Sequence, residues 1–153
     1  MNRSRYVTRR IDHIDRAIIA ALSEDGRRTI KEVADLIDMS SPSITARIDK
    51  LKDAGAIRGY TALVDPKAFG LNIAAFVRIH ARPGEVRRVA QLLQDTPEVV
   101  EADQITGEGC FLAKVVVCDA QELHAVAARF EQYASADTAI ILAPTVVRRL
   151  PKL

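Results

Sequence analysis

Apolar residues recur every three or four positions in three stretches near the start of the chain, which is the spacing of one face of an α-helix. These stretches cover residues 14–22, 30–37 and 44–51. Short polar segments separate them. The pattern predicts three short helices in succession, each with one buried face.

Residues that favour helix N-termini lie just before each stretch. Asp12 is suited to cap the first helix, and Thr29 with Glu32 forms a capping-box sequence for the second. Ser40 or Ser41 can cap the third, where the proline that follows fits the first turn. The caps and the short break before the third helix indicate a helix-turn-helix.

The third helix carries a second stripe beside its buried one. At 100° per residue this stripe consists of Ser43, Ala46, Arg47 and Lys50. We place the acidic residues Asp49 and Asp53 mostly on the far side. Small, hydroxyl and basic side chains at the start of such a helix are what DNA recognition in a major groove needs. An ordinary solvated helix face is the alternative.

We therefore predict that this helix enters the major groove of double-stranded DNA. Arg47 is the first candidate for a base or phosphate contact. The supporting candidates are Ser41, Ser43, Thr45 and Lys50.

The remainder of the chain alternates strand-like and helix-like patterns. Residues 57–64 read as a linker strand, and we place the domain boundary between residues 65 and 66. The expected strands are 71–82, 99–106, 111–118 and 138–150, and the expected helices have faces at 86–93 and 123–130. The order β-α-β-β-α-β predicts a ferredoxin-like domain with a four-stranded antiparallel sheet and both helices on one face. The predicted fold class is α+β: a winged-type helix-turn-helix domain, residues 1–65, and a ferredoxin-like domain, residues 66–153.

The expected strands are apolar on both sides. In the strand 111–118 only Lys114 interrupts the apolar residues. Two helices cover one face of a sheet, and the other face would remain an exposed apolar patch. This predicts a homodimer with sheets packed face to face, which would present two recognition helices to two half-sites.

Charge is distributed unevenly along the chain. Residues 1–67 hold 13 Lys or Arg against 10 Asp or Glu, and residues 68–153 hold 9 against 10. The first ten residues include Arg3, Arg5, Arg9 and Arg10 and no acid. This segment is either an arm that contacts phosphates or a solvated tail. No apolar run approaches the roughly 20 residues that span a bilayer, so we predict a cytoplasmic protein without a membrane segment.

The two cysteines lie on one expected strand. Eight residues at about 3.3 Å each put Cys110 and Cys118 ~26 Å apart, beyond the roughly 7 Å that a disulfide allows. We expect buried thiols in a reducing compartment.

Catalysis has little support in the sequence. His13, His80 and His124 fall on separate elements, and the chain has no metal-ligand spacing, phosphate-binding loop or catalytic triad order. We predict that the protein is not an enzyme and holds no cofactor or metal.

The chain resembles the leucine-responsive regulatory protein/AsnC family of feast-or-famine transcription regulators. The resemblance covers roughly residues 11–150 and is strongest from the first helix through residue 66. The positions that carry it are the Ser-Pro-Ser of residues 41–43, Arg47, Leu51, Gly55, Ile57, Gly59 and Tyr60. It implies a homodimer that assembles further, to an octamer, and a domain that binds small effectors, commonly amino acids.

A second match to the family lies in the turn at residues 106–108, which precedes Phe111 and Leu112. The family has an aromatic and an acidic residue where this chain has Gly109 and Cys110. The candidates for effector binding are Thr106, Gly107, Glu108, Gly109 and Cys110, with Thr138 and Ile140 added from their family position between dimers. Glycine amides can bind a carboxylate and Glu108 an ammonium, although a plain hairpin is the alternative.

Two other functions share this architecture. Sirohaem decarboxylases resemble it, but their substrate would need a cluster of exposed His and Arg side chains. We expect Arg78 and His80 to face opposite sides of their strand, which argues against that enzyme. A binding module that has lost DNA affinity is the other possibility, and the intact stripe of Ser43, Arg47 and Lys50 argues against it.

Overall fold

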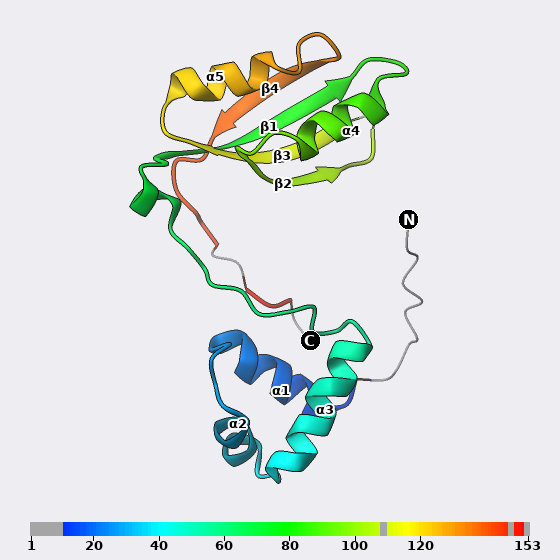
Figure 1. The fold of residues 1–153 in the computed structure, drawn as a ribbon, viewed down its shortest axis with the longest axis vertical. Helices are drawn as coiled ribbons and strands as arrows, with labels where there is room; N and C mark the ends of the chain where they lie inside the picture. The colour runs from blue at the N-terminus through cyan, green and yellow to red at the C-terminus, as the bar shows by residue number, and fades with distance from the viewer. Residues whose placement is uncertain (1–10, 108–109, 147–148, 152–153) are drawn as a thin grey trace. The chain divides into compact units, whose positions relative to one another are not determined.

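The computed structural model describes residues 11–107, 110–146 and 149–151. The chain divides into two compact units, one that contains residues 11–63 together with 149–151 and one that contains residues 64–146 (Figure 1). The first division lies two residues before the expected boundary. None of the helices in the described ranges is long and apolar enough to cross a membrane.

The first unit consists of three helices, as predicted. They are α1 (His13–Glu24), α2 (Ile30–Ile37) and α3 (Ser41–Asp53). Their apolar faces meet in one core, whose buried members are Ile18, Val33, Ala34, Ile44, Ile48 and Leu51. The helical spacing of these residues explains why three short helices are stable together, since each one buries its apolar stripe against the other two.

Reciprocal hydrogen bonds cap the first two helices. Asp15 N donates to Asp12 Oδ1 at 2.8 Å, and Asp12 N donates to Asp15 Oδ2 at 3.2 Å. Thr29 and Glu32 form the predicted capping box at the start of α2, with Glu32 N donating to Thr29 Oγ1 at 3.2 Å. Ser40 is the N-cap residue of α3, although its hydroxyl makes no capping bond.

The linker strand expected over residues 57–64 is not formed. Within this described segment the chain has no strand, and Tyr60, Leu63 and Val64 are exposed. A β-strand needs a neighbour to accept and donate its backbone hydrogen bonds. No such neighbour pairs with this segment in the described part of the single chain.

The second unit has the predicted β-α-β-β-α-β order. Its elements are β1 (Ile73–Ala81), α4 (Val86–Gln94), β2 (Val99–Gln104), β3 (Cys110–Val117), α5 (Ala120–Ala128) and β4 (Ala134–Ile140). A short 3₁₀ helix, η1 (Pro66–Phe69), precedes them. The sheet is antiparallel throughout, with strand order β2-β3-β1-β4.

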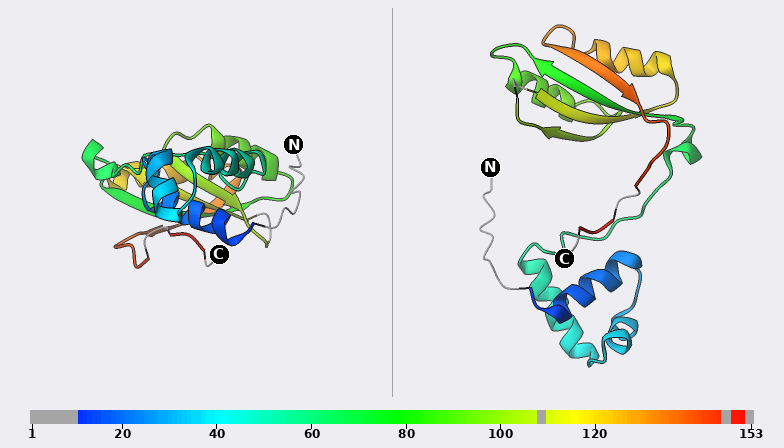
Figure 2. Two further views of the ribbon diagram at one scale, coloured as in Figure 1. Left: turned by 90° about the horizontal axis from the view of Figure 1, so that it is seen from below. Right: turned by 180° about the vertical axis from the view of Figure 1, so that it is seen from behind.

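Both helices cover the same face of this sheet, as the opposite views of Figures 1 and 2 show. Alternate residues of β1 and β3 point toward them, including Ala75 and Val77 on β1 and Val115 on β3. Val89 of α4 and Val126 of α5 pack against these strand residues from the helix side, and both are fully buried. The ferredoxin-like arrangement of the prediction is therefore confirmed.

The last strand begins and ends earlier than expected. It covers Ala134–Ile140, whereas the sequence pattern predicted residues 138–150. The backbone N–H of Ile141 donates to Ala74 O, and β1 itself begins at Ile73, so the chain beyond runs past the end of its partner strand. Pro144 also lacks the N–H that a ladder would need.

The open face of the sheet is mixed rather than uniformly apolar. Phe76 is 43% exposed there, and Leu112 is half-buried beside it. Arg78 and Asp137 are opposite each other in register on the same face, and both are exposed. The expected apolar patch is thus present only in part, because Lys114 of β3 lies opposite Phe76 in register.

Candidate DNA-binding helix and effector site

The supporting candidates on α3 differ in how accessible they are. Thr45 and Lys50 are exposed, whereas Ser41 and Ser43 are half-buried. Thr45 Oγ1 donates to Ser41 O at 3.0 Å, and the hydroxyls of Ser43 and Ser40 lie 2.8 Å apart. In the described part of the chain Lys50 makes no ion pair, so its ammonium is available to a phosphate or a base edge.

Arg47 is engaged within the helix-turn-helix. Its Nη1 donates to Asp12 Oδ2 at 2.8 Å and to Asp15 Oδ1 at 2.7 Å. Its side chain is 27% exposed, and that of Asp15 is 17% exposed. The sequence pattern placed Arg47 in the DNA-facing stripe, but it could not show this pairing, because the contact joins residues more than 30 positions apart.

Hydrogen bonds to Asp12 stabilise its charged form. Its pKa is lowered, chiefly by the backbone N–H of Asp15 and then by the hydrogen bond from Arg47. The pKa of Arg47 is raised by the same two carboxylates, Asp12 first. The N-terminus of α1 adds a favourable dipole for both acids.

The helix-turn-helix body is not basic. Residues 11–63 contain eight Lys or Arg and nine Asp or Glu. Asp49 and Asp53 are exposed on α3, and Asp49 lies 3.8 Å from Lys52. The basic excess of the N-terminal part of the sequence therefore comes from Arg3, Arg5, Arg9 and Arg10, which lie outside the described residues.

The turn between β2 and β3 contains the main effector candidates. Thr106 and Gly107 are exposed, and Gly107 has φ 123°, a conformation that favours glycine. Glu108 and Gly109 lie outside the described residues. Cys110 begins β3, and its side chain is also outside the description.

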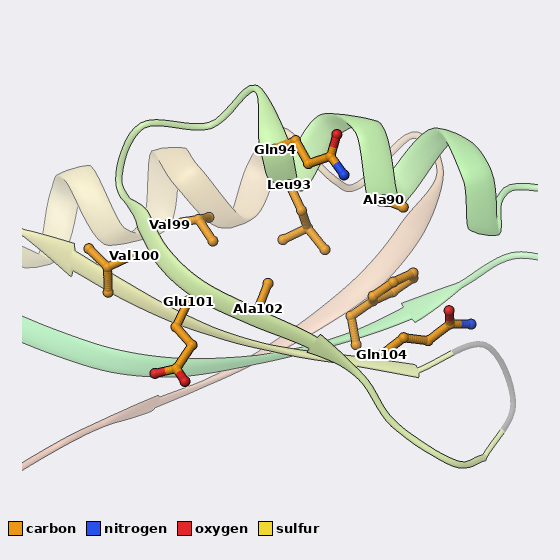
Figure 3. A pocket seen from close by; sticks show the side chains of 9 residues that line it. Ala90, Leu93, Gln94, Val99, Val100, Glu101, Ala102 and Gln104 are labelled. Carbon is orange, nitrogen blue, oxygen red and sulfur yellow. The ribbon is translucent and has the colours of Figure 1, made fainter. Parts of the chain in front are cut away.

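A cavity of about 310 Å³ lies between α4 and the strand that leads into this turn. In Figure 3, Leu93 of α4 and Val99 and Ala102 of β2 point into the space between helix and strand. Gln104 and Phe111, which are opposite each other in register, line the end nearest the turn. The volume is at the lower end of the range for small-molecule sites, about 300–1,000 Å³. The sequence did not predict this cavity, because the spacing between a helix and a strand has no local sequence signature.

Thr138 and Ile140 lie elsewhere in the same sheet. Both are exposed on β4, which is the edge strand opposite β2. Thr138 pairs with Val77 of β1, so two other strands separate it from the cavity. One chain therefore does not bring all the effector candidates together.

Two expectations about other residues were wrong. Arg78 and His80 are two positions apart on β1 and share its open face, because side chains on the same side of a strand recur every second residue. His80 Nε2 lies 3.7 Å from Asp137 Oδ2. Cys118 is exposed rather than buried, because β3 ends at Val117 and the chain turns there into α5.

Solved structures resemble most of the chain. LrpC of Bacillus subtilis superposes with a TM-score of 0.86 and 26% identity over 92% of this chain and all of that one. A transcriptional regulator of Neisseria meningitidis in complex with L-methionine has a TM-score of 0.83 and 28% identity, covering 92% of this chain and 96% of the other.

Sequence relatives agree with the structural ones. An HTH-type transcriptional regulator of Mycobacterium tuberculosis is 30% identical over 148 residues, 93% of this chain and 98% of that protein. The leucine-responsive regulatory protein of Rhizobium meliloti is 36% identical over 109 residues, 69% of this chain and 70% of that protein.

A helix-turn-helix unit joined to a sheet domain with a cavity of small-molecule size defines a class of DNA-binding transcription regulators with a ligand-binding domain. Residues 11–58 match winged helix-turn-helix DNA-binding domains, and residues 74–151 match the Lrp/AsnC ligand binding domain. The chain belongs to the Lrp/AsnC family.

Proposed function

We propose that this DNA-binding regulator reads operator DNA as a homodimer through the exposed side of α3, and that an amino acid bound near the β2–β3 turn adjusts its assembly. The observation that carries the first part is the set of accessible side chains on α3. Thr45 and Ala46 are exposed in its second turn, and Lys50 is exposed in its last turn. A recognition helix contacts base edges mainly with its N-terminal residues. A regulator of this kind works where genomic DNA is, in the cytoplasm.

Replacing Lys50 with glutamine tests the DNA contact. Losing one phosphate contact should reduce the slope of log affinity against log salt by about 1. Fluorescence anisotropy with DNA from upstream of the protein's own gene, over a series of salt concentrations, measures this slope.

Lys52→Gln is the matched control, because it removes the same charge from the same helix. Lys52 lies 3.8 Å from Asp49, and its position on the helix differs from that of Lys50 by about 200°. We expect Lys52→Gln to change the salt slope less than Lys50→Gln does. Equal slopes for Lys50→Gln and the parent protein would remove Lys50 from the interface.

The cavity beside the β2–β3 turn supports the effector part of the proposal. Leu93, Val99 and Ala102 provide apolar surface, while Gln94 and Gln104 provide amide groups at its rim. An apolar space with a few polar groups suits an amino acid with an apolar side chain. The Neisseria meningitidis neighbour is a complex with L-methionine, which is an amino acid of this kind.

A thermal-shift screen against the amino acids tests this site. A ligand that binds only the native state raises the unfolding temperature by mass action. Gln104→Leu should weaken the effect of the best stabiliser. Gln121→Leu is the control, since Gln121 is exposed on α5 and does not line the cavity. A screen without any stabiliser would contradict the effector proposal.

The open face of the sheet is the surface we propose for dimerisation, and further association of dimers into an octamer would use surfaces that this dimer leaves free. Phe76 lies on the second strand from the β4 edge, with apolar Leu112 nearby on β3. In a dimer of dimers, Thr138 and Ile140 of one subunit can approach the β2–β3 turn of another. This would complete the effector site that one chain leaves divided.

A further inference from the structure

Arg47 differs from the other basic residues of α3 in what its guanidinium contacts. Both of its recorded hydrogen bonds come from Nη1 and go to carboxylates of the α1 N-terminus, at 2.8 Å to Asp12 and 2.7 Å to Asp15. Arg47 lies 35 and 32 positions from these acids, so the contact joins the third helix to the start of the first.

The capping box of α1 prepares the two acids for this contact. One oxygen of each carboxylate already accepts a backbone N–H within the box: Asp12 Oδ1 from Asp15 N, and Asp15 Oδ2 from Asp12 N. The other oxygen of each accepts from Arg47. All four oxygens thus have donors, and their orientation is determined by the helix terminus rather than by flexible side chains.

Charge also argues that this guanidinium does not face DNA. Two carboxylates and one guanidinium leave a net charge of −1 at this point. A phosphate that approached Arg47 would meet two fixed negative charges within hydrogen-bonding distance of the same nitrogen. Asp15 is 17% exposed and Asp12 is 44% exposed, so solvent screens the contact of Arg47 with Asp15 less than its contact with Asp12.

The position of Arg47 on α3 agrees with an internal role. It immediately precedes the buried Ile48 and lies one turn before the buried Leu51. The exposed residues Ala46 and Lys50 lie on the adjacent side of the helix. One side of the basic stripe is therefore turned toward α1, and the other toward solvent.

We infer that Arg47 is a positioning residue: it holds α3 against the N-terminus of α1 in the orientation that DNA recognition requires, and it does not itself bind DNA. The inference rests on the proposed DNA-binding function and assigns a role within it. It replaces the direct contact that the helical wheel suggested for this residue.

Asp12→Asn gives the sharpest test, because a positioning role and a direct DNA contact of Arg47 predict opposite changes in operator affinity. Asparagine is as good an N-cap residue as aspartate, so the start of α1 is retained. If Asp12 affects DNA binding only through its negative charge, its removal should strengthen operator binding. If Arg47 positions α3, Asp12→Asn should weaken operator binding about fivefold, which corresponds to about 1 kcal/mol.

Asp49→Asn is the matched control. Asp49 is an exposed acid on α3 itself, and its nearest recorded partner is Lys52 at 3.8 Å. Its replacement also removes one negative charge, but no contact with α1. Operator affinity should stay equal or rise for Asp49→Asn.

Substitutions of Arg47 give a second readout. Arg47→Gln should lower affinity while the salt slope stays that of the parent protein, whereas a lost phosphate contact would reduce the slope by about 1. Arg47→Lys should restore much of the affinity, because a single ammonium can donate to both carboxylates as Nη1 does. Circular dichroism at the assay temperature checks that each variant is folded.

Unchanged or stronger binding by Asp12→Asn, or a reduced salt slope for Arg47→Gln, would overturn the inference. If the parent protein bound no DNA at all, the proposed function would fail, and the ion pair would still be tested by urea unfolding. The shift in the urea midpoint for the double variant should differ from the sum of the shifts for Asp12→Asn and Arg47→Gln. Such a difference would support the link between α1 and α3. A shift for the double variant equal to that sum would overturn the link.

Discussion

At the scale of single residues, the thiol of Cys118 shows how a local arrangement determines chemical behaviour. Glu122 Oε2 accepts the backbone N–H of Cys118 at 2.8 Å, and the thiol donates to Asp119 Oδ2 at 3.5 Å. These acids raise the pKa of Cys118 to about 11, with Glu122 the larger cause. Negative charge nearby disfavours the thiolate, which is the reactive form.

We expect Cys118 to react slowly with iodoacetamide although it is exposed. With a pKa of about 11, its thiolate at pH 8 is roughly a hundredfold scarcer than that of an ordinary cysteine. Glu122→Gln should increase the alkylation rate, and Asp119→Asn should do so while retaining the cap of α5. Mass spectrometry of the peptide that contains Cys118 separates it from Cys110. A rate in the native parent protein equal to that in the unfolded chain would contradict the prediction.

At the scale of elements, an ion pair joins the end of α5 to the start of β2. Arg129 Nη1 and Nη2 donate to Glu98 Oε2 and Oε1 at 2.9 and 2.8 Å, so the pair is bidentate. Glu98 is 19% exposed, and the hydrogen bond from Arg129 is the main reason that its pKa is lowered. The pair therefore links the end of α5 to the residue that precedes β2.

The stability from this pair should depend on pH in a definite direction. Because the pKa of Glu98 is lowered from 4.5, the contribution is present above that value and is lost as pH falls through the folded-state pKa. At pH 7, Glu98→Gln should lower the free energy of unfolding by about 1 kcal/mol. Urea unfolding of variant and parent at pH 7 and in acid below the folded-state pKa measures the difference, which should disappear in acid.

Glu131→Gln is the control for this experiment. Glu131 is exposed just after α5, and its carboxylate makes no ion pair in the described part of the chain. A loss as large for Glu131→Gln as for Glu98→Gln would show that net charge, rather than the pair, is responsible.

Helices proved easier to predict from the sequence than strand ends. Residues 14–22, 30–37 and 44–51 bury their own periodic faces, and local caps such as Thr29 with Glu32 mark where the helices begin. The strand Ala134–Ile140 begins with Ala-Ser-Ala-Asp, which has weak strand preference, and it forms because β1 lies beside it. Residues 57–64 have strand preference and no partner, so they form no strand in the described chain.

At the scale of the whole molecule, the open face of the sheet is the surface that we propose for association of two copies. Phe76 is surrounded in register by Lys114 on β3 and Ala139 on β4. An exposed aromatic residue beside a long basic side chain is a combination found in protein–protein interfaces. The helix-covered face has no such free surface near the middle of β1, where Val77 is buried.

Phe76→Glu should therefore convert the dimer to single chains at micromolar concentration, because a charge buried in the interface without a partner costs several kcal/mol. Light scattering after size-exclusion chromatography gives the mass. Leu36→Glu is the control, since Leu36 is also an exposed apolar residue, 62% exposed against 43% for Phe76, but lies on α2. A dimer of unchanged stability with Phe76→Glu would remove this face from the proposal.

The sequence by itself determined the three helices, the β-α-β-β-α-β order and the membership of the Lrp/AsnC family, because these depend on periodic patterns, caps and local motifs. It also indicated the turn at residues 106–110 as a place to look for an effector. The tertiary structure decided what local patterns do not contain. It placed Arg47 between Asp12 and Asp15, formed the cavity between α4 and β2, and ended β4 where β1 begins. Each of these depends on contacts between residues distant in the chain, whose geometry is set only when the core packs.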